Sequence, residues 1–98
     1  MLYQNYPNPF NPSTKIRFTI PSVTLRVSSR AESRDEGSRV QLKVFDILGS
    51  EIATLVNEEK PAGTYEVDFN ASSLSSGVYI YTLKVDGVSY SKSMILLR

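Results

Sequence analysis

Histidine and cysteine are the side chains that most often carry catalysis at neutral pH, and this 98-residue sequence contains neither. Without them the usual general base, the Ser-His and Cys-His nucleophile pairs and most transition-metal sites are excluded. None of the serines lies in a G-x-S-x-G or S-x-x-K arrangement, and the sequence has no glycine-rich phosphate loop. We therefore predict a domain that is not an enzyme and that holds no cofactor and no metal.

Carboxylates are the remaining candidates for acid–base chemistry. Two neighbouring pairs occur, Asp35-Glu36 and Glu58-Glu59, both in polar stretches that resemble solvated surface. A glycosidase needs two carboxylates held apart across a cleft, and a calcium loop needs alternating acids. Neither Asp46 nor Asp86 has that alternating spacing. We interpret these acids as surface charges.

Three tyrosines at strand spacing, Tyr79, Tyr81 and Tyr90, have two readings. Flat rings stack on the apolar faces of sugars, so a carbohydrate platform is one alternative. At alternating positions they are more simply core residues and cross-strand partners whose hydroxyls reach a hydrogen-bond acceptor. We favour the core reading and keep a carbohydrate-binding module as an alternative.

Size and charge exclude further functions. The chain is long enough for one core, its hydrophobic share of 41% is ordinary for a globular protein, and its net charge of +1 argues against nucleic acid or an anionic membrane as partner. No basic segment followed by an apolar one opens the sequence. We therefore expect any export signal to belong to a longer parent protein.

The elements that position these residues begin with a lead-in at residues 1–14, where three prolines alternate with asparagines. Proline fixes φ, removes a donor and disfavours helix at the preceding residue. We expect an ordered, extended, turn-rich segment here, with Tyr6 and Phe10 as its apolar anchors.

Apolar and polar residues then alternate with the period of half-buried strands over Ile16–Ile20 and Val40–Val44. A further alternating run occurs at 23–27, but its apolar residues have odd numbers, whereas those of Ile16–Ile20 have even numbers. A continuous flat strand would therefore change its buried face, so we predict a bulge or turn at Pro21-Ser22. Residues 29–38 are polar and charged, and we expect a mobile loop.

The second half repeats the pattern, and Asp86-Gly87 is a strong hairpin signal between its last two strands. Tyr79 follows a Leu and a Gly corner, as in the tyrosine corner of immunoglobulin-like domains. We predict strands at 52–56, 65–69, 79–85 and 88–97, a turn at 57–63 and a small polar connection at 70–76. Together these predict one all-β domain over 1–98, an immunoglobulin-like antiparallel β-sandwich of about seven strands.

Short motifs along the whole chain resemble one family, the type A C-terminal sorting domains of the type IX (Por) secretion system. That family is itself similar to the immunoglobulin-like domain of flagellar hook-capping proteins. The matching segments, in order, are Leu2–Thr14, Val44–Gly49, Ala62–Val67, Leu74–Tyr81 and Lys92–Arg98. Each is short, but they occur in the family's order from one end of the chain to the other.

Most family-motif residues have a structural explanation, because turns require glycine and tyrosines pack. We expect this of Pro7, Asn8, Pro9, Phe10, Gly63, Tyr65, Gly77 and Tyr79. The departure from the family is the long charged stretch 22–39. For it we predict an extended hairpin that pairs Val23–Ser28 with Arg39–Phe45.

The resemblance implies a non-catalytic secretion signal at the end of a larger parent protein. The parent would fold in the periplasm, cross the outer membrane through the type IX translocon, and be released or attached at the cell surface. A sortase-like peptidase would then remove the domain at a site near or before its start, coupling the parent to lipopolysaccharide. An accessory immunoglobulin-like spacer is the other alternative.

For recognition we hypothesise that the final strand, with Lys92 and Arg98 at its ends, offers backbone groups at an edge for the machinery to pair with. The same edge would also support a homodimer. The predicted recognition residues are Lys92, Met94, Leu96, Leu97 and Arg98.

Overall fold

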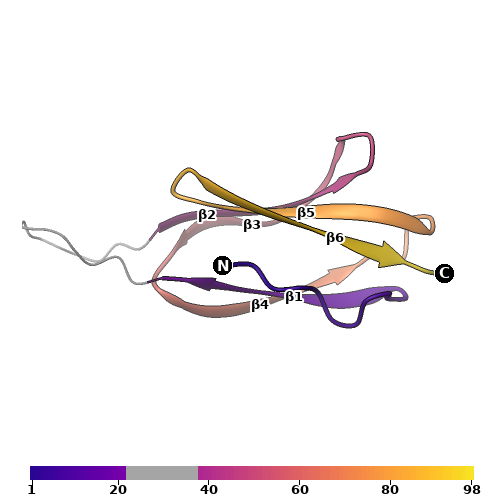
Figure 1. The fold of residues 1–98 in the computed structure, drawn as a ribbon, viewed down its shortest axis with the longest axis horizontal. Helices are drawn as coiled ribbons and strands as arrows, with labels where there is room; N and C mark the ends of the chain where they lie inside the picture. The colour runs from indigo at the N-terminus through magenta and orange to yellow at the C-terminus, as the bar shows by residue number, and fades with distance from the viewer. Residues whose placement is uncertain (22–37) are drawn as a thin grey trace, which may run out of the picture.

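The computed structural model describes residues 1–21 and 38–98, and all regular structure in these ranges is β. The strands are β1 (Ser13–Ile20), β2 (Ser38–Asp46), β3 (Glu51–Lys60), β4 (Gly63–Asn70), β5 (Gly77–Val85) and β6 (Val88–Leu96). Figure 1 shows them as two layers, with β2, β3, β5 and β6 on one side and β1 and β4 on the other.

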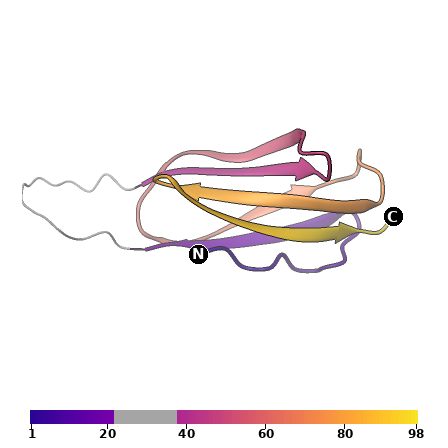
Figure 2. The ribbon, with the colours of Figure 1, turned by 45° about the horizontal axis from the view of Figure 1, so that its top comes forward.

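The strand order is β3-β2-β5-β6 in the larger sheet and β1-β4 in the smaller one, and all the strand pairs are antiparallel. The turned view in Figure 2 shows the four strands of the larger sheet side by side. The predicted all-β antiparallel sandwich is confirmed. The described residues form six strands where about seven were predicted, and the immunoglobulin-like relation stays a prediction. The strand predicted at 23–27 lies outside those residues, as do Ser22 of the predicted bulge and residues 29–37 of the loop predicted at 29–38.

The core lies between the two sheets because each strand turns its alternating apolar residues inward. In β1 the side chains of Ile16, Phe18 and Ile20 are buried while their neighbours face solvent. In β5 the inward side chains include Tyr81 and Leu83, which have no exposed surface. Alternation therefore identified the buried face of these strands correctly.

The predicted hairpin between Val23–Ser28 and Arg39–Phe45 is wrong. The segment Arg39–Phe45 lies in β2, which pairs with β3 along one edge and with β5 along the other. A strand has only two edges, so β2 has none left for a third partner. Ser38, placed at the end of the predicted loop, begins β2 and is buried.

Strand β3 is longer than predicted. It continues to Lys60, and β4 begins at Gly63. Of the turn expected at 57–63, only residues 61 and 62 therefore lie between the two strands. The extra residues pair with β2, for example Glu58 opposite Val40. They are polar because β3 is an outer strand of its sheet in the described structure, and an edge strand can carry polar side chains throughout.

The lead-in is ordered, as predicted, and joins the two sheets (Figure 2). It first pairs with β1, where Tyr6 exchanges two backbone hydrogen bonds of 3.0 Å with Lys15. It then reaches β6, where Phe10 forms a parallel bridge with Leu96. Phe10 is buried as expected, but Tyr6 is 80% exposed and is not an anchor. Leu2, 6% exposed, fills that role.

Two local predictions are confirmed at the ends of β5. Asp86 and Gly87 form the hairpin turn with φ of 49° and 89°, the left-handed conformation that such two-residue turns require. The Tyr79 hydroxyl donates to the Ser75 carbonyl at 2.6 Å, which is the tyrosine corner. The connection predicted at 70–76 covers residues 71–76, because Asn70 ends β4, and it consists of turns and bends without a helix.

Candidate recognition surface

Among the acidic candidates, Glu58 and Asp46 lie at the surface, and the pair Asp35-Glu36 lies outside the described residues. Glu58 pairs with Lys60 at 3.1 Å, with 62% of its side chain exposed. The Asp46 carboxylate accepts hydrogen bonds of 2.9 Å from the Leu48 and Ser50 amides, so it organises a turn. Across 1–21 and 38–98, no three metal-ligating residues gather at one point. In the same ranges no helix is long and apolar enough to span a membrane.

The three tyrosines do not form an exposed platform. Tyr79 and Tyr81 are 7% and 0% exposed, which confirms the core reading for both. The Tyr81 hydroxyl accepts from the Asn5 amide at 2.8 Å and donates to the Tyr3 carbonyl at 2.7 Å. Only Tyr90 keeps substantial exposure, at 38%. A single ring gives little support for carbohydrate stacking.

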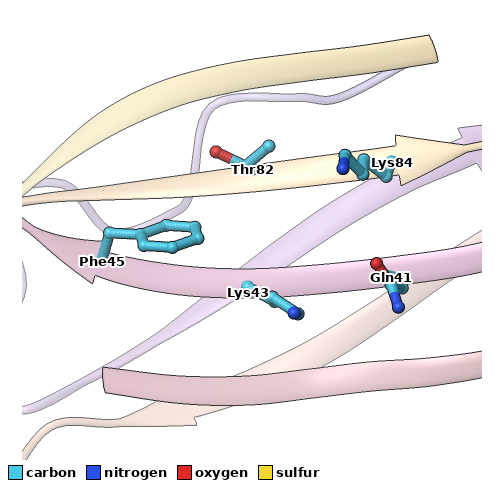
Figure 3. A pocket seen from close by; sticks show the side chains of 5 residues that line it. All are labelled: Gln41, Lys43, Phe45, Thr82 and Lys84. Atoms are coloured by element: carbon cyan, nitrogen blue, oxygen red, sulfur yellow. The ribbon is translucent and has the colours of Figure 1, made fainter. Parts of the chain in front are cut away.

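A shallow hollow of about 100 Å³ lies on the outer face of the larger sheet (Figure 3). Small-molecule sites usually measure roughly 300–1,000 Å³ and are mainly apolar. This hollow is smaller and two lysines border it, so it does not resemble a ligand pocket. Its lining residues are Gln41, Lys43, Phe45, Thr82 and Lys84.

Strand β6 is an outer strand of its sheet in the described structure, but half of its outer edge is covered. Phe10 donates to the Ile95 carbonyl at 2.9 Å and accepts from the Leu97 amide at 3.0 Å. The Asn8 side chain accepts from the Ile95 amide at 2.9 Å. Strand addition beside Ser93–Leu97 therefore requires the lead-in to leave.

The predicted recognition residues separate into different environments. Met94 and Leu96 have no exposed surface, because they point into the core, so a partner of the folded domain cannot contact their side chains. Their part in recognition therefore stays a prediction about the backbone of the strand and not about these two side chains. Lys92 is partly exposed and Leu97 is 54% exposed, so both are accessible.

Arg98 is accessible but engaged within the domain. Its Nη1 donates to the carbonyls of Ala71, Ser72 and Leu74 at 3.1, 2.8 and 2.7 Å. Its backbone amide donates to the Ser76 hydroxyl at 2.9 Å. The side chain therefore binds the connection between β4 and β5.

The tyrosines of the family motifs make matching local contacts. The Tyr65 hydroxyl donates to the Pro61 carbonyl at 2.6 Å, four residues upstream, as Tyr79 does with Ser75. The Tyr65 ring also stacks on Phe18, with centroids 5.5 Å apart. Gly63 and Gly77 begin the two strands that carry these tyrosines, β4 and β5.

Pro7 and Pro9 of the lead-in lie at the surface. The hydrogen bonds that hold this part of the lead-in come from the Pro7 carbonyl and from the residues on either side of Pro9. Pro7 is exposed, and its carbonyl accepts from the Thr14 hydroxyl at 2.8 Å and from the Asn5 side chain at 3.1 Å. Pro9 is also exposed, between Asn8 and Phe10, which both bond to β6. These contacts hold the lead-in in place.

Sequence reasoning missed an exposed apolar surface, which we call the apolar end. It comprises Ile47 and Leu48 at the tip of the β2–β3 turn, 69% and 86% exposed, and the cross-strand pair Val78 and Ile95, 44% and 40% exposed. The signal was present in β5, whose first residues are apolar on both faces. Only the pairing shows that Val78 lies beside Ile95 on the outer face.

A family model described as the secretion system C-terminal sorting domain matches residues 4–97, which is nearly the whole chain. Comparison with curated proteins and with solved structures gave no match. The match covers the lead-in, both sheets and the final strand described above.

Proposed function

The chain belongs to the family of secretion system C-terminal sorting domains, and from that premise we propose which steps of export it serves and which surface serves them. As a member it is a C-terminal sorting signal for type IX secretion, and the family is not catalytic. Membership implies export, secretion or surface attachment, and interaction with the type IX machinery. The family match over residues 4–97 carries this conclusion.

We propose further that the folded domain is recognised on the periplasmic side and guides a larger parent protein through the outer-membrane translocon. A sortase-like peptidase then separates parent and signal. The sandwich supports this order of events, because its recognition features come from residues that only strand pairing brings together. Val78 and Ile95, for example, become neighbours only after β5 and β6 pair. An unfolded chain does not offer that surface.

We propose that the machinery contacts the apolar end together with Leu97, which follows Ile95 on the outer face by the alternation of the strand. Burying this surface leaves few polar groups without partners, since Asp46 already accepts from two turn amides. The nearby Glu51 carboxylate lies 3.4 Å from the Lys43 ammonium. Exposed apolar side chains surrounded by satisfied polar groups are typical of protein–protein contact sites.

A reporter fusion tests the function. The chain is placed at the C-terminus of a periplasmic reporter in a host that has the type IX system, and in the same host without its translocon. We expect surface reporter only in the first strain. Reporter that stays in the periplasm of the first strain, while folded, would refute the proposal.

The contact surface is tested in the same fusion by Ile95→Ser, with Val88→Ser as the matched control at the other end of β6. Both side chains are exposed, at 40% and 54%. We expect export to fall at least severalfold for the first variant only. Equal export of both variants would show that the apolar end is not the contact.

We propose that a homodimer, if it forms, pairs through the first half of β6, which the lead-in does not cover. Among the described residues, the lead-in covers β6 only from Ser93 onward, so self-pairing would use Val88–Lys92. In this segment, Ser89 and Ser91 direct their backbone groups away from β5, by the alternation of an antiparallel pair. Sedimentation of the wild-type chain and of Ser91→Pro tests it, and a concentration-independent monomer in both would refute it.

A further inference from the structure

The carbonyl oxygens of one short turn converge on a single cationic nitrogen. Nη1 of Arg98 lies 2.7, 2.8 and 3.1 Å from the carbonyl oxygens of Leu74, Ser72 and Ala71. The turn joins β4 to β5 at the end of the sandwich where the chain's last residues lie (Figure 1). Three acceptors around one nitrogen form a cradle, which we define as these three carbonyls.

The cradle has an internal geometry that keeps its oxygens together. The Leu74 amide donates to the Ala71 carbonyl at 2.9 Å, and the Ser72 amide donates to the Asn70 side chain at 2.9 Å. The Ala71 amide in turn donates to the Pro12 carbonyl at 2.8 Å, and Ala71 has no exposed surface. The turn is therefore anchored to the lead-in and to the core.

The chemistry of this arrangement favours a cationic N–H donor. Carbonyl oxygens present partial negative charge, and hydrogen bonds from a charged donor are stronger than neutral ones. Because an amino group of a guanidinium has two hydrogens, three short contacts include one shared hydrogen. A neutral amide makes weaker hydrogen bonds with these carbonyls, and a carboxylate has no hydrogen to donate to them.

We propose that the turn Ala71–Leu74 is a binding cradle for a cationic nitrogen, and that Arg98 serves sorting by filling it and not by presenting its charge to the export machinery. The inference rests on the proposed function for its link to sorting. Arg98 is thus a positioning residue: it fastens the end of β6 to the connection between the two sheets. That fastening holds the exposed Leu97 in a defined place.

The first arm of the test uses the 98-residue chain without any export machinery. Backbone hydrogen exchange is followed at residues 71–76 in the wild type, Arg98→Ala, Arg98→Lys and the control Lys92→Ala. We expect roughly tenfold faster exchange in Arg98→Ala, a smaller change in Arg98→Lys, and none in the control. Unchanged exchange in Arg98→Ala, or an equal effect in the control, would overturn the cradle.

The second arm measures export of the reporter fusion and adds Ser76→Ala, which removes the acceptor of the Arg98 amide but leaves every charge in place. We expect Ser76→Ala to speed exchange severalfold and to lower export in step with it. Full export of Ser76→Ala despite faster exchange, or lost export of Arg98→Ala without faster exchange, would overturn the proposal. A wild-type fusion that is not exported refutes the proposed function and leaves the exchange result standing.

Discussion

Replacing Tyr81 with phenylalanine removes one oxygen atom from the interior of the sandwich. That hydroxyl joins β5 to the lead-in, because it accepts from the Asn5 amide at 2.8 Å and donates to the Tyr3 carbonyl at 2.7 Å. Tyr81 has no exposed surface and Asn5 is 2% exposed, so water does not replace the lost partner without rearrangement. The Tyr81→Phe variant therefore leaves two backbone groups without their partner.

The expected cost follows from these two groups. Of the two, the Asn5 amide is buried, whereas Tyr3 is 40% exposed and water can reach its carbonyl. A buried donor left unsatisfied costs about 1–3 kcal/mol, so the variant should lose about 2 kcal/mol of unfolding free energy. For a domain of this size, about 2 kcal/mol lowers the melting temperature by about 8–16 °C. The ring itself stays, so no cavity larger than one oxygen adds to the loss.

Thermal and urea unfolding of the 98-residue chain measure the effect. Tyr90→Phe is the matched control, because it removes the same atom from a side chain that is 38% exposed. We expect the control to lie within about 0.5 kcal/mol of wild type. Equal stability of the two variants would refute the reasoning that the Tyr81 hydroxyl fastens the lead-in.

The same hydroxyl predicts a pH dependence. Burial raises the pKa of the Tyr81 phenol to about 12, although the hydrogen bond from the Asn5 amide opposes the rise. The unfolded chain titrates near 10, so it loses this proton first and stability falls as pH rises from about 10 to 12. The advantage of wild type over Tyr81→Phe should be complete below pH 10 and shrink above it. A constant difference up to pH 12 would contradict this.

Two turns give the remaining predictions. Gly87→Ala should lower the free energy of unfolding in urea by about 1 kcal/mol, because φ of 89° is unfavourable for an L side chain. A steric clash does not contribute, since no atom lies within 4 Å of the added Cβ. Unaltered stability would show that the turn relaxes freely. Asp46→Ala should lower the free energy of unfolding by about 1 kcal/mol, because the Leu48 and Ser50 amides lose their acceptor. Asp46→Asn keeps an acceptor oxygen and should change the free energy of unfolding little. Equal losses in the two variants would show that the charge matters more than the two hydrogen bonds.

Tertiary pairing explains where the sequence-based predictions were incomplete. Tyr6 and Phe10 are both aromatic residues next to a proline in the lead-in, yet only Phe10 is buried. The difference arises because the lead-in passes from β1 to β6 between them. Residues 57–60 read as a turn because they are polar, but pairing with β2 makes them a strand.

The candidate site shows the same division. The run Met94–Leu97 is apolar throughout, so alternation does not tell its inner face from its outer face. Register with β5 places Met94 opposite the buried Tyr79 and Ile95 opposite the exposed Val78. The contacts of Arg98 with a turn 24 to 27 residues earlier have no local signature at all.

By itself the sequence determined that the chain lacks the usual catalytic groups, that it alternates as β-strands, that Asp86-Gly87 turns a hairpin, and that its motifs are those of a sorting domain. These features depend on residue type and on neighbours within a few positions. Only the tertiary structure decided which strands share an edge, which side of β6 meets the core, and where the cation of Arg98 goes. Those outcomes depend on contacts between distant segments, whose geometry exists only when both sheets have formed.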